Sequence, residues 1–330
     1  MIKTSIIIPT RNGAKWINFT INSLLKQNIE PSYYEILIVD NDSTDDTKKI
    51  IETFILNNPA YNMRYIFEPE PGSLSARHRG MMEAKGEILI FVDDDVITEK
   101  GWLAAIMESF EDEDTHLVGG PNIPIFEVSP PEWINKYFQI GKDKFICGSL
   151  SLLYLGENKI EIDPLRVWSL NWSIRKKTFI DCGGFHPCVI PKHLQQFQGD
   201  GETGLSLILK EKGFKAVYSP KVKVFHRIPK ERLTVTFFEG RFFYQGVCDS
   251  YTQIRQNQGV NNLILPDYLD DKKISSSLSS YDQYKEIINW RIRNAYVDGF
   301  IFHQKAVKKS EILLKWVLRE NYFNYKLPVM

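Results

Sequence analysis

The chain has 330 residues, of which 43% are hydrophobic and 25% charged, a composition typical of globular proteins with a large buried core. Lys plus Arg and Asp plus Glu both number 41, so the formal net charge is zero. No overall field draws the protein to nucleic acid or anionic lipid, and we expect no nucleic-acid partner. Apolar runs fall short of the roughly 20 residues that span a bilayer. The first residues also lack the zones of a secretory signal, so we expect neither a transmembrane helix nor export.

The cysteines indicate a reducing compartment. None of the four stands in the paired CxxC spacing of zinc sites: Cys147, Cys182, Cys188 and Cys248. We therefore expect free, mostly buried thiols and a cytoplasmic location.

The first 120 residues alternate short strand patterns with helical patterns. Strands are predicted at 4–9, 35–40, 63–68 and 87–93, and helices at 14–27, 44–56 and 73–85. This alternation is typical of a mostly parallel sheet covered by helices. Ligands bind such sheets at the carboxyl ends of the strands. Polar residues follow three of the strands and should converge there: Thr10 to Asn12, Asp40 to Asp42, and Asp93 to Asp95.

The pattern changes twice further along the chain. Residues 118–164 read as loops with short strands and a helix near 133–140. A strand at 166–174, a Gly-Gly-Phe loop at 183–185, a helix at 201–212 and strands at 216–219 and 222–226 complete the α/β part. Beyond Pro229 the segments are long, aromatic and mostly helical, with breaks at 256–262 and 275–280. We predict one unit at 1–229 and a helical extension at 230–330.

Three consecutive aspartates end an apolar strand: Asp93, Asp94 and Asp95. Adjacent carboxylates are costly to place together unless a cation compensates their charge. Their hard oxygen ligands suit Mg²⁺ or Mn²⁺, which proteins commonly share with substrate phosphates. An acidic turn on a solvated surface is the alternative.

Four segments in chain order resemble the family 2 glycosyltransferases of GT-A fold. Residues 5–12 resemble the first strand and nucleotide loop, and 35–45 the second strand and acidic loop. Residues 72–95 look like the donor-site helix and DxD strand. The acceptor-side motifs and a final histidine are matched by 183–185, 199–205 and 224–226. The resemblance covers roughly residues 3–230. It implies a mixed, mostly parallel α/β sheet flanked by helices, with donor-binding residues 1–120 and acceptor-side residues 121–229.

The same resemblance implies metal-dependent, inverting transfer of a sugar from a nucleoside diphosphate to an acceptor hydroxyl. Asp95 and His226 would bind Mn²⁺ or Mg²⁺, while Asp93 and Asp94 would support the metal and touch the donor ribose. The remaining donor contacts would come from Pro9, Thr10, Asn12, Asp40, Asn41 and Arg77. A structural role for the histidine and a surface salt bridge for the arginine are the alternatives.

Glu202 is the catalytic base that the resemblance implies, with Asp200 as the second choice. A carboxylate that only complements a helix dipole is the alternative for Glu202. Sugar or acceptor contacts would come from Trp168, Asn171 and Trp172, unless the tryptophans pack in the core. Asn41 stands where many family members have Asp. Because its amide can still bond a pyrimidine imide, we expect UDP or dTDP sugars as donors.

Two other functions are the alternatives to sugar transfer, and each would share part of this sequence pattern. A sugar nucleotidyltransferase would need a Gly-rich phosphate loop after the first strand, which Thr10 to Gly13 does not supply. A non-catalytic nucleotide-sugar-binding protein would bind the donor without transfer. For the transferase, we expect a saccharide or lipid-linked saccharide acceptor and a role in bacterial polysaccharide or glycan biosynthesis. We expect the C-terminal helices to pack against the core or a second copy, or to rest peripherally on the cytoplasmic membrane.

Overall fold

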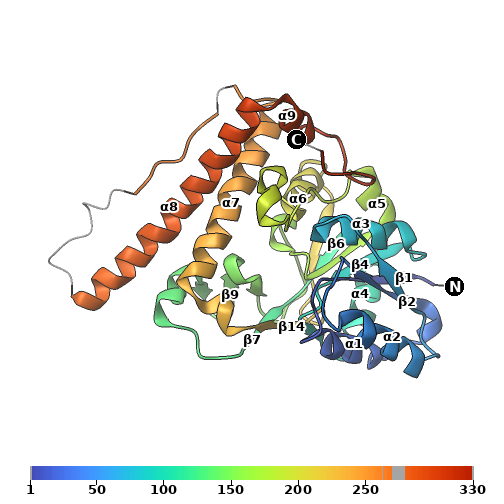
Figure 1. Ribbon diagram of the computed structural model, residues 1–330. Helices are drawn as coiled ribbons and strands as arrows, with labels where there is room; N and C mark the ends of the chain where they lie inside the picture. Colours follow the sequence, from blue (N-terminus) through green and yellow to red (C-terminus); the bar gives the residue numbers. More distant parts are fainter. Residues whose placement is uncertain (1, 262, 270–278, 329–330) are drawn as a thin grey trace.

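The computed structural model describes residues 2–261, 263–269 and 279–328. Its centre is an eight-stranded sheet in the order β11-β13-β6-β12-β4-β1-β2-β3, with helices on both faces (Figure 1). This is the mixed, mostly parallel α/β architecture expected from the sequence.

The half of this sheet that carries the expected donor-binding residues, the donor half, follows the predicted elements closely. Four mutually parallel strands form it: β1 (Thr4–Thr10), β2 (Tyr34–Asp40), β3 (Met63–Phe67) and β4 (Ile88–Val92). β12 (Asn171–Arg175) then pairs antiparallel with both β4 and β6 (Thr115–Gly119). The sheet ends with β13 (Lys215–Tyr218), parallel to β6, and β11 (Ile160–Glu161), antiparallel to β13.

Alternating side chains of β1 face two separate hydrophobic clusters, because successive residues of a strand point to opposite faces. Ile7 is buried with α3 (Ser73–Glu83), α5 (Lys176–Asp181) and α6 (Glu202–Glu211). Ile6 and Ile8 are buried with the helices of the other face: α1 (Ile17–Leu25), α2 (Thr47–Asn57) and α4 (Trp102–Ser109). The sheet is therefore covered on both sides, which leaves its strand ends as the open edge.

A second sheet brings the acidic turn, the three aspartates 93–95 after β4, next to His226. Its order is β5-β14-β7-β10-β9-β8, with bounds Val96–Thr98, Val224–Ile228, Asn122–Phe126, Leu152–Tyr154, Lys144–Cys147 and Gln139–Gly141. β5 starts directly after Asp95 and pairs antiparallel with β14, so that His226 lies opposite Val96. The predicted helix near 133–140 is a 3₁₀ turn, η2 (Glu132–Tyr137). The predicted strand at 166–174 begins only at Asn171, after the 3₁₀ turn η4 (Pro164–Arg166).

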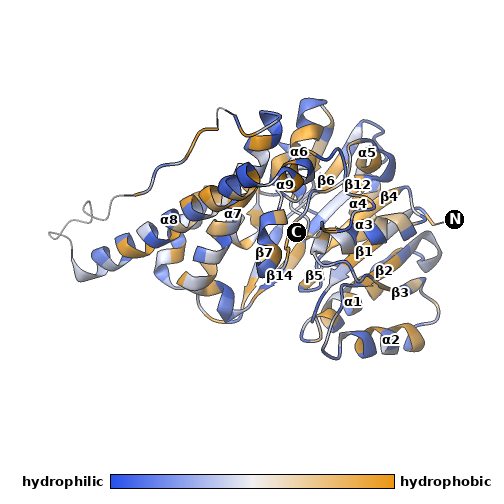
Figure 2. Cartoon of the chain, turned by 45° about the horizontal axis from the view of Figure 1, so that its top comes forward, coloured by the Kyte–Doolittle hydropathy of each residue, from blue (hydrophilic) through white to orange (hydrophobic). Residues whose placement is uncertain are grey.

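The C-terminal third forms a helical hairpin beside the sheets. α7 (Val235–Gln256) and α8 (Ser280–Lys309) lie side by side, and α9 (Glu311–Val317) follows (Figure 1). Hydrophobic and hydrophilic residues alternate along both long helices (Figure 2). α7 ends where the first polar break was predicted. Asn262 and residues 275–278 of the predicted breaks lie outside the described residues. Within the described ranges, no helix is long and apolar enough to span a membrane.

The last described segment returns to the α/β body. Trp316, Tyr322 and Tyr325 are buried in the same hydrophobic cluster as the α3 side chains. The Leu327 amide donates to Glu70 Oε1 at 2.9 Å, on the loop before α3. The helical extension thus shares a core with the donor half.

Gly246 on α7 and Gly299 on α8 allow the two helices to approach closely. A Cβ atom at Gly246 would lie 1.9 Å from the Tyr296 carbonyl oxygen. We expect Gly246→Ala to lower the free energy of unfolding by about 3 kcal/mol through overpacking, measured by urea denaturation. Gly240→Ala in the same helix is the control, because its Cβ would meet nothing within 4 Å. Alanine there should raise stability by roughly 0.5–1 kcal/mol. Equal effects of the two substitutions would contradict this account of the crossing.

Buried His78 joins α3 to the C-terminal segment in its neutral form. Nδ1–H donates to the Tyr322 carbonyl and Nε2 accepts from the Phe185 amide, both at 3.1 Å. Burial lowers the pKa of His78 to about 3. Since the unfolded value is about 6.5, the stabilisation is present above pH 6.5 and is lost as pH falls toward 3. In that window, the buried neutral His78 should lower the free energy of unfolding by about 1.4 kcal/mol for each pH unit of acidification.

Urea unfolding at pH 7.5 and 5.5 tests this prediction. The fall in stability between the two pH values should be smaller in His78→Asn than in the unaltered protein. Exposed His193 provides the control, and His193→Asn should keep the full fall. An unchanged fall in His78→Asn would show that His78 is not a source of acid sensitivity.

Candidate active site

A cleft of about 500 Å³ opens where α3, the acidic turn, α6 and α7 meet. Its lining includes Arg77, Asp93, Glu202, His226 and Arg232. Since Asp93 follows β4 directly, the cleft lies at the carboxyl end of this strand.

The first two aspartates of the turn are held by the donor half. Asp93 Oδ1 accepts from Arg77 Nη2 at 2.8 Å. The Asp94 carboxylate accepts a hydrogen bond from the Thr10 hydroxyl, which ties the end of β1 to the turn. Burial, together with the charge of Asp95, raises the pKa of Asp94 to about 7. A Cβ atom at Gly13 would lie 2.3 Å from both the Asp94 and Thr10 side-chain oxygens, so this approach requires a glycine.

Asp95 and His226, the two metal ligands that the family resemblance implies, lie next to each other. His226 Nε2 lies 3.6 Å from Asp95 Oδ2, and both side chains are buried. The Arg232 guanidinium contacts both: Nη2 donates to Asp95 Oδ2 at 3.0 Å and Nη1 lies 2.9 Å from His226 Nε2. Burial alone would raise the pKa of Asp95. The neighbouring His226 side chain and the positive charge of Arg232 nevertheless hold it below its usual value.

The Asp95 and His226 pair fits a divalent cation. A carboxylate oxygen and an imidazole nitrogen are ligands for Mn²⁺, and Asp95 Oδ1 is buried with no hydrogen-bond partner among the described residues. Within the described ranges, no three His, Cys, Asp or Glu side chains gather around one point. Asp93, which was expected to support the metal, forms an ion pair with Arg77. The other ligands would then be donor phosphate oxygens and water, as is usual for such ions.

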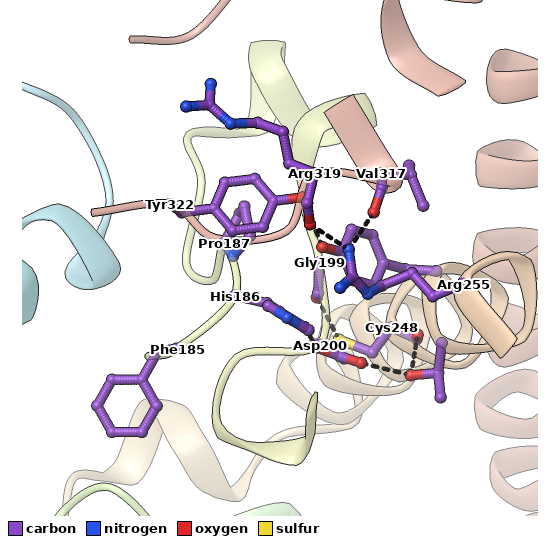
Figure 3. Close-up of polar contacts among 12 residues, drawn as sticks. Phe185, His186, Pro187, Gly199, Asp200, Cys248, Arg255, Val317, Arg319 and Tyr322 are labelled. Atoms are coloured by element: carbon purple, nitrogen blue, oxygen red, sulfur yellow. Dashed lines mark hydrogen bonds and ion pairs between the residues drawn. The ribbon is translucent and has the colours of Figure 1, made fainter. Parts of the chain in front are cut away.

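Glu202 and Asp200 have different environments. Glu202 begins α6 and lines the cleft, close enough for its charge to raise the pKa of Cys188 alongside the larger effect of burial. Its carboxylate makes no hydrogen bond or ion pair with any described residue. Asp200 Oδ1 lies 2.6 Å from His186 Nδ1, and Oδ2 accepts from the Thr252 hydroxyl at 2.6 Å (Figure 3). These contacts favour Glu202 as the base.

The network around Asp200 fixes the loop before α6. Cys248 Sγ donates to the Gly199 carbonyl at 3.0 Å, and Arg255 donates to the carbonyls of Val317 and Arg319 (Figure 3). The Asp200 loop, α7 and the C-terminal segment are thereby joined. Asp200 is thus part of the network that holds the loop before α6, the helix that Glu202 begins.

The residues expected to contact the nucleotide, which follow β1 and β2, make hydrogen bonds within the protein. Asp40 accepts from the Ser43 amide and the Tyr65 hydroxyl. Asn41 Oδ1 accepts from the Gly72 amide, while Nδ2 donates to two carbonyls of the loop before α3. Asn12 Oδ1 accepts from the Thr44 amide. Pro9 lies inside β1. The donor roles of these residues stay predictions.

The three residues predicted to contact a sugar make contacts inside the protein core. Trp172 is fully buried and packs edge-on against Phe185. Asn171 accepts from Trp102 Nε1 at 3.0 Å and donates to the Val222 carbonyl. Trp168, which precedes β12, packs against the cluster containing Ile6 and Ile8. None of the three lines the cleft among the described residues, whereas Ser169 does. Their role in sugar binding stays a prediction.

With this geometry in place, the sequence can be compared with known proteins. The profile of "Glycosyl transferase family 2" matches residues 5–170, half of the chain. The chain belongs to glycosyl transferase family 2. Glycosyltransferase AglE of Haloferax volcanii is 37% identical over 118 residues, which cover 35% of this chain and 38% of AglE. A glucosyl-dolichyl phosphate glucuronosyltransferase of the same archaeon is 22% identical over 276 residues, covering 82% and 81% of the two chains.

Solved structures of glycosyltransferases share the fold. The mannosyltransferase PcManGT from Pyrobaculum calidifontis, in complex with GDP-Man and Mn²⁺, has a TM-score of 0.55 at 16% identity. The similarity covers 96% of this chain and 84% of PcManGT. Staphylococcus aureus TarS, residues 1–349 with UDP-GlcNAc, has a TM-score of 0.50 at 16% identity, covering 93% and 92%. The expected GT-A fold is confirmed.

Sequence reasoning missed several cleft residues of this family 2 glycosyltransferase. Arg232 lies beyond the boundary predicted at Pro229, in the 3₁₀ turn η6 (Lys230–Leu233). Arg241 and Tyr244 lie on α7 and also line the cleft. The last two are three residues apart, so they share one helix face. That spacing of polar groups within an aromatic helix was the available signal. No sequence pattern marked Arg232.

Proposed function

We propose that this protein transfers a sugar from a nucleoside diphosphate to an acceptor hydroxyl with inversion at the anomeric carbon. The observation that carries the proposal is that His226 and Glu202 line the same cleft. Buried Asp95 lies 3.6 Å from His226, so the two could share a cation, and Glu202 presents an unpaired carboxylate to the cleft. Family membership and the GT-A fold support the same activity.

The reaction follows from these positions. The acceptor oxygen forms a bond to the anomeric carbon, the bond from that carbon to the diphosphate breaks, and Glu202 takes the hydroxyl proton. Asp95 and His226 would hold Mn²⁺ or Mg²⁺, which supplies positive charge where negative charge develops on the leaving diphosphate. Arg77 holds Asp93 at the floor of the cleft and keeps a guanidinium beside the donor site.

UDP or dTDP sugars are the donors that we propose. The preference rests on Asn41, whose amide oxygen would have to exchange its hydrogen bond with the Gly72 amide for one with the pyrimidine imide. TarS was solved with UDP-GlcNAc and PcManGT with GDP-Man, so a guanine donor is the competing outcome.

A saccharide, free or lipid-linked, is the acceptor that we propose, in a cytoplasmic pathway of bacterial polysaccharide or glycan synthesis. The name of the glucuronosyltransferase that aligns with 82% of this chain supports the lipid-linked form. Peripheral membrane contact or pairing of two copies through α7 and α8 belongs to the same proposal. Flotation with liposomes and sedimentation of the free protein test these two interactions.

A panel of UDP, dTDP and GDP sugars with Mn²⁺ tests the function. We expect one donor class to raise the melting temperature and to release nucleoside diphosphate slowly by hydrolysis. Stabilisation without release would support the non-catalytic binding protein instead. Consumption of a nucleoside triphosphate and sugar phosphate, with release of pyrophosphate, would identify a nucleotidyltransferase.

A further inference from the structure

The two groups that would bind a metal are already bound to a cation of the protein. Arg232 reaches Asp95 Oδ2 at 3.0 Å and His226 Nε2 at 2.9 Å. Arginine only donates hydrogen bonds, so His226 Nε2 must accept this one. The lone pair that would ligate a metal therefore points at the guanidinium. Asp95 Oδ2 is bound in the same way, whereas Asp95 Oδ1 has no partner among the described residues. A metal ion that ligates His226 Nε2 must therefore displace Arg232 from that atom.

Arg232 is the member of this trio that is free to move. Its side chain is 34% exposed, whereas those of His226 and Asp95 are 4% and 11% exposed. The pairing of β5 with β14 fixes the other two, and the Arg227 amide donates to the Asp95 carbonyl at 3.0 Å. Arg232 lies in η6, a short turn between β14 and α7, and its side chain lines the open cleft. It can leave the pair without disturbing a strand.

We propose that Arg232 is an internal cation that competes with the divalent metal for Asp95 and His226. In the donor-free protein the guanidinium neutralises the buried carboxylate and occupies the imidazole lone pair. Metal binding displaces it into the cleft, where an anionic donor offers it a new partner. Arg232 therefore weakens metal binding when no nucleotide is present. This inference rests on the proposed metal-dependent function and adds a regulatory residue to it.

Mn²⁺ binding without nucleotide is the direct test, followed by the electron paramagnetic resonance signal of free Mn²⁺. We expect Arg232→Met to lower the Kd for Mn²⁺ by about tenfold or more, within the usual range of coupling between sites. Arg232→Lys should give an intermediate Kd, because an ammonium cannot bridge both atoms as a planar guanidinium does. It also provides a second variant if the first folds poorly.

Two controls separate the explanations. Arg241→Met removes another arginine of the same cleft, one that does not contact Asp95 or His226. If Arg232 competes directly with the metal, this substitution should change the Kd for Mn²⁺ by less than about threefold. A general effect of positive charge in the cleft would lower the Kd in both variants. Asp95→Asn should abolish binding at this site. If Asp95→Asn removes binding while Arg232→Met leaves the Kd unchanged, the competition is refuted and the metal site stands. An equal gain in Arg241→Met refutes it too. Unchanged Mn²⁺ binding in Asp95→Asn overturns the metal site as well.

Discussion

Asp95→Asn is expected to lower sugar transfer by at least about 10³-fold, because it removes the charged oxygen that would hold the metal at the leaving diphosphate. The buried side chain lies beside His226 and Arg232, and asparagine has a similar shape. Steady-state release of nucleoside diphosphate at saturating Mn²⁺ measures the effect.

Exposed Asp181 offers the matched control for that substitution. It pairs with Lys177 on α5 and does not line the cleft. Asp181→Asn should retain full activity. An Asp95→Asn enzyme within about tenfold of the unaltered rate would mean that no catalytic metal depends on this carboxylate.

Glu202→Gln is expected to lower kcat by roughly 10²–10⁴-fold, the usual contribution of a general base. The substitution keeps the shape of the side chain and removes its capacity to accept a proton. Donor binding in the presence of Mn²⁺ should stay within about threefold, because the base acts on the acceptor hydroxyl. Measured kcat for transfer, together with calorimetric donor affinity, separates the two effects.

Asp200→Asn should behave differently from Glu202→Gln. Both Asp200 oxygens are engaged inside the protein, by His186 and Thr252. Its replacement should cost about 1–3 kcal/mol of unfolding free energy, since buried partners lose a charged acceptor. A folded, inactive Asp200→Asn enzyme beside a normally active Glu202→Gln enzyme would transfer the role of base to Asp200.

The donor half of the fold could be predicted because its strands are short apolar runs separated by clear helical patterns. β1, β2, β3 and β4 lie within one or two residues of the predicted strands. The meeting of Asp95 with His226 followed from the family resemblance, and the pairing of β5 with β14 explains it. The order of the strands beyond residue 118 was not predictable, because two- to five-residue strands in mixed sheets leave little periodic signal.

The less predictable site residues are those whose role depends on neighbours distant in sequence. Asn41 looks free to bind a base until the loop before α3 is in place, where it accepts from the Gly72 amide. Trp172 reads equally as a sugar platform or a core residue, and only the contact with Phe185 distinguishes these. The residues around Arg232 in the sequence do not indicate its role, because that role depends on its contacts with Asp95, 137 residues away, and His226, 6 residues away.

The packing of the C-terminal segment also depends on contacts that are distant in sequence. Aromatic spacing predicted helices that pack, but not their partner. Tyr325 donates to the Pro71 carbonyl and Leu327 to Glu70, both on the loop that Asn41 organises. The last described residues therefore hold the loop before α3.

A crystal structure with Mn²⁺ and a nucleoside diphosphate, with anomalous data at the manganese edge, tests the central claim most directly. We predict one anomalous peak bonded to Asp95 and His226, with the diphosphate completing its ligands and the Glu202 carboxylate facing it across the cleft. A peak away from Asp95 and His226, or a nucleotide bound elsewhere on the protein, would contradict the account.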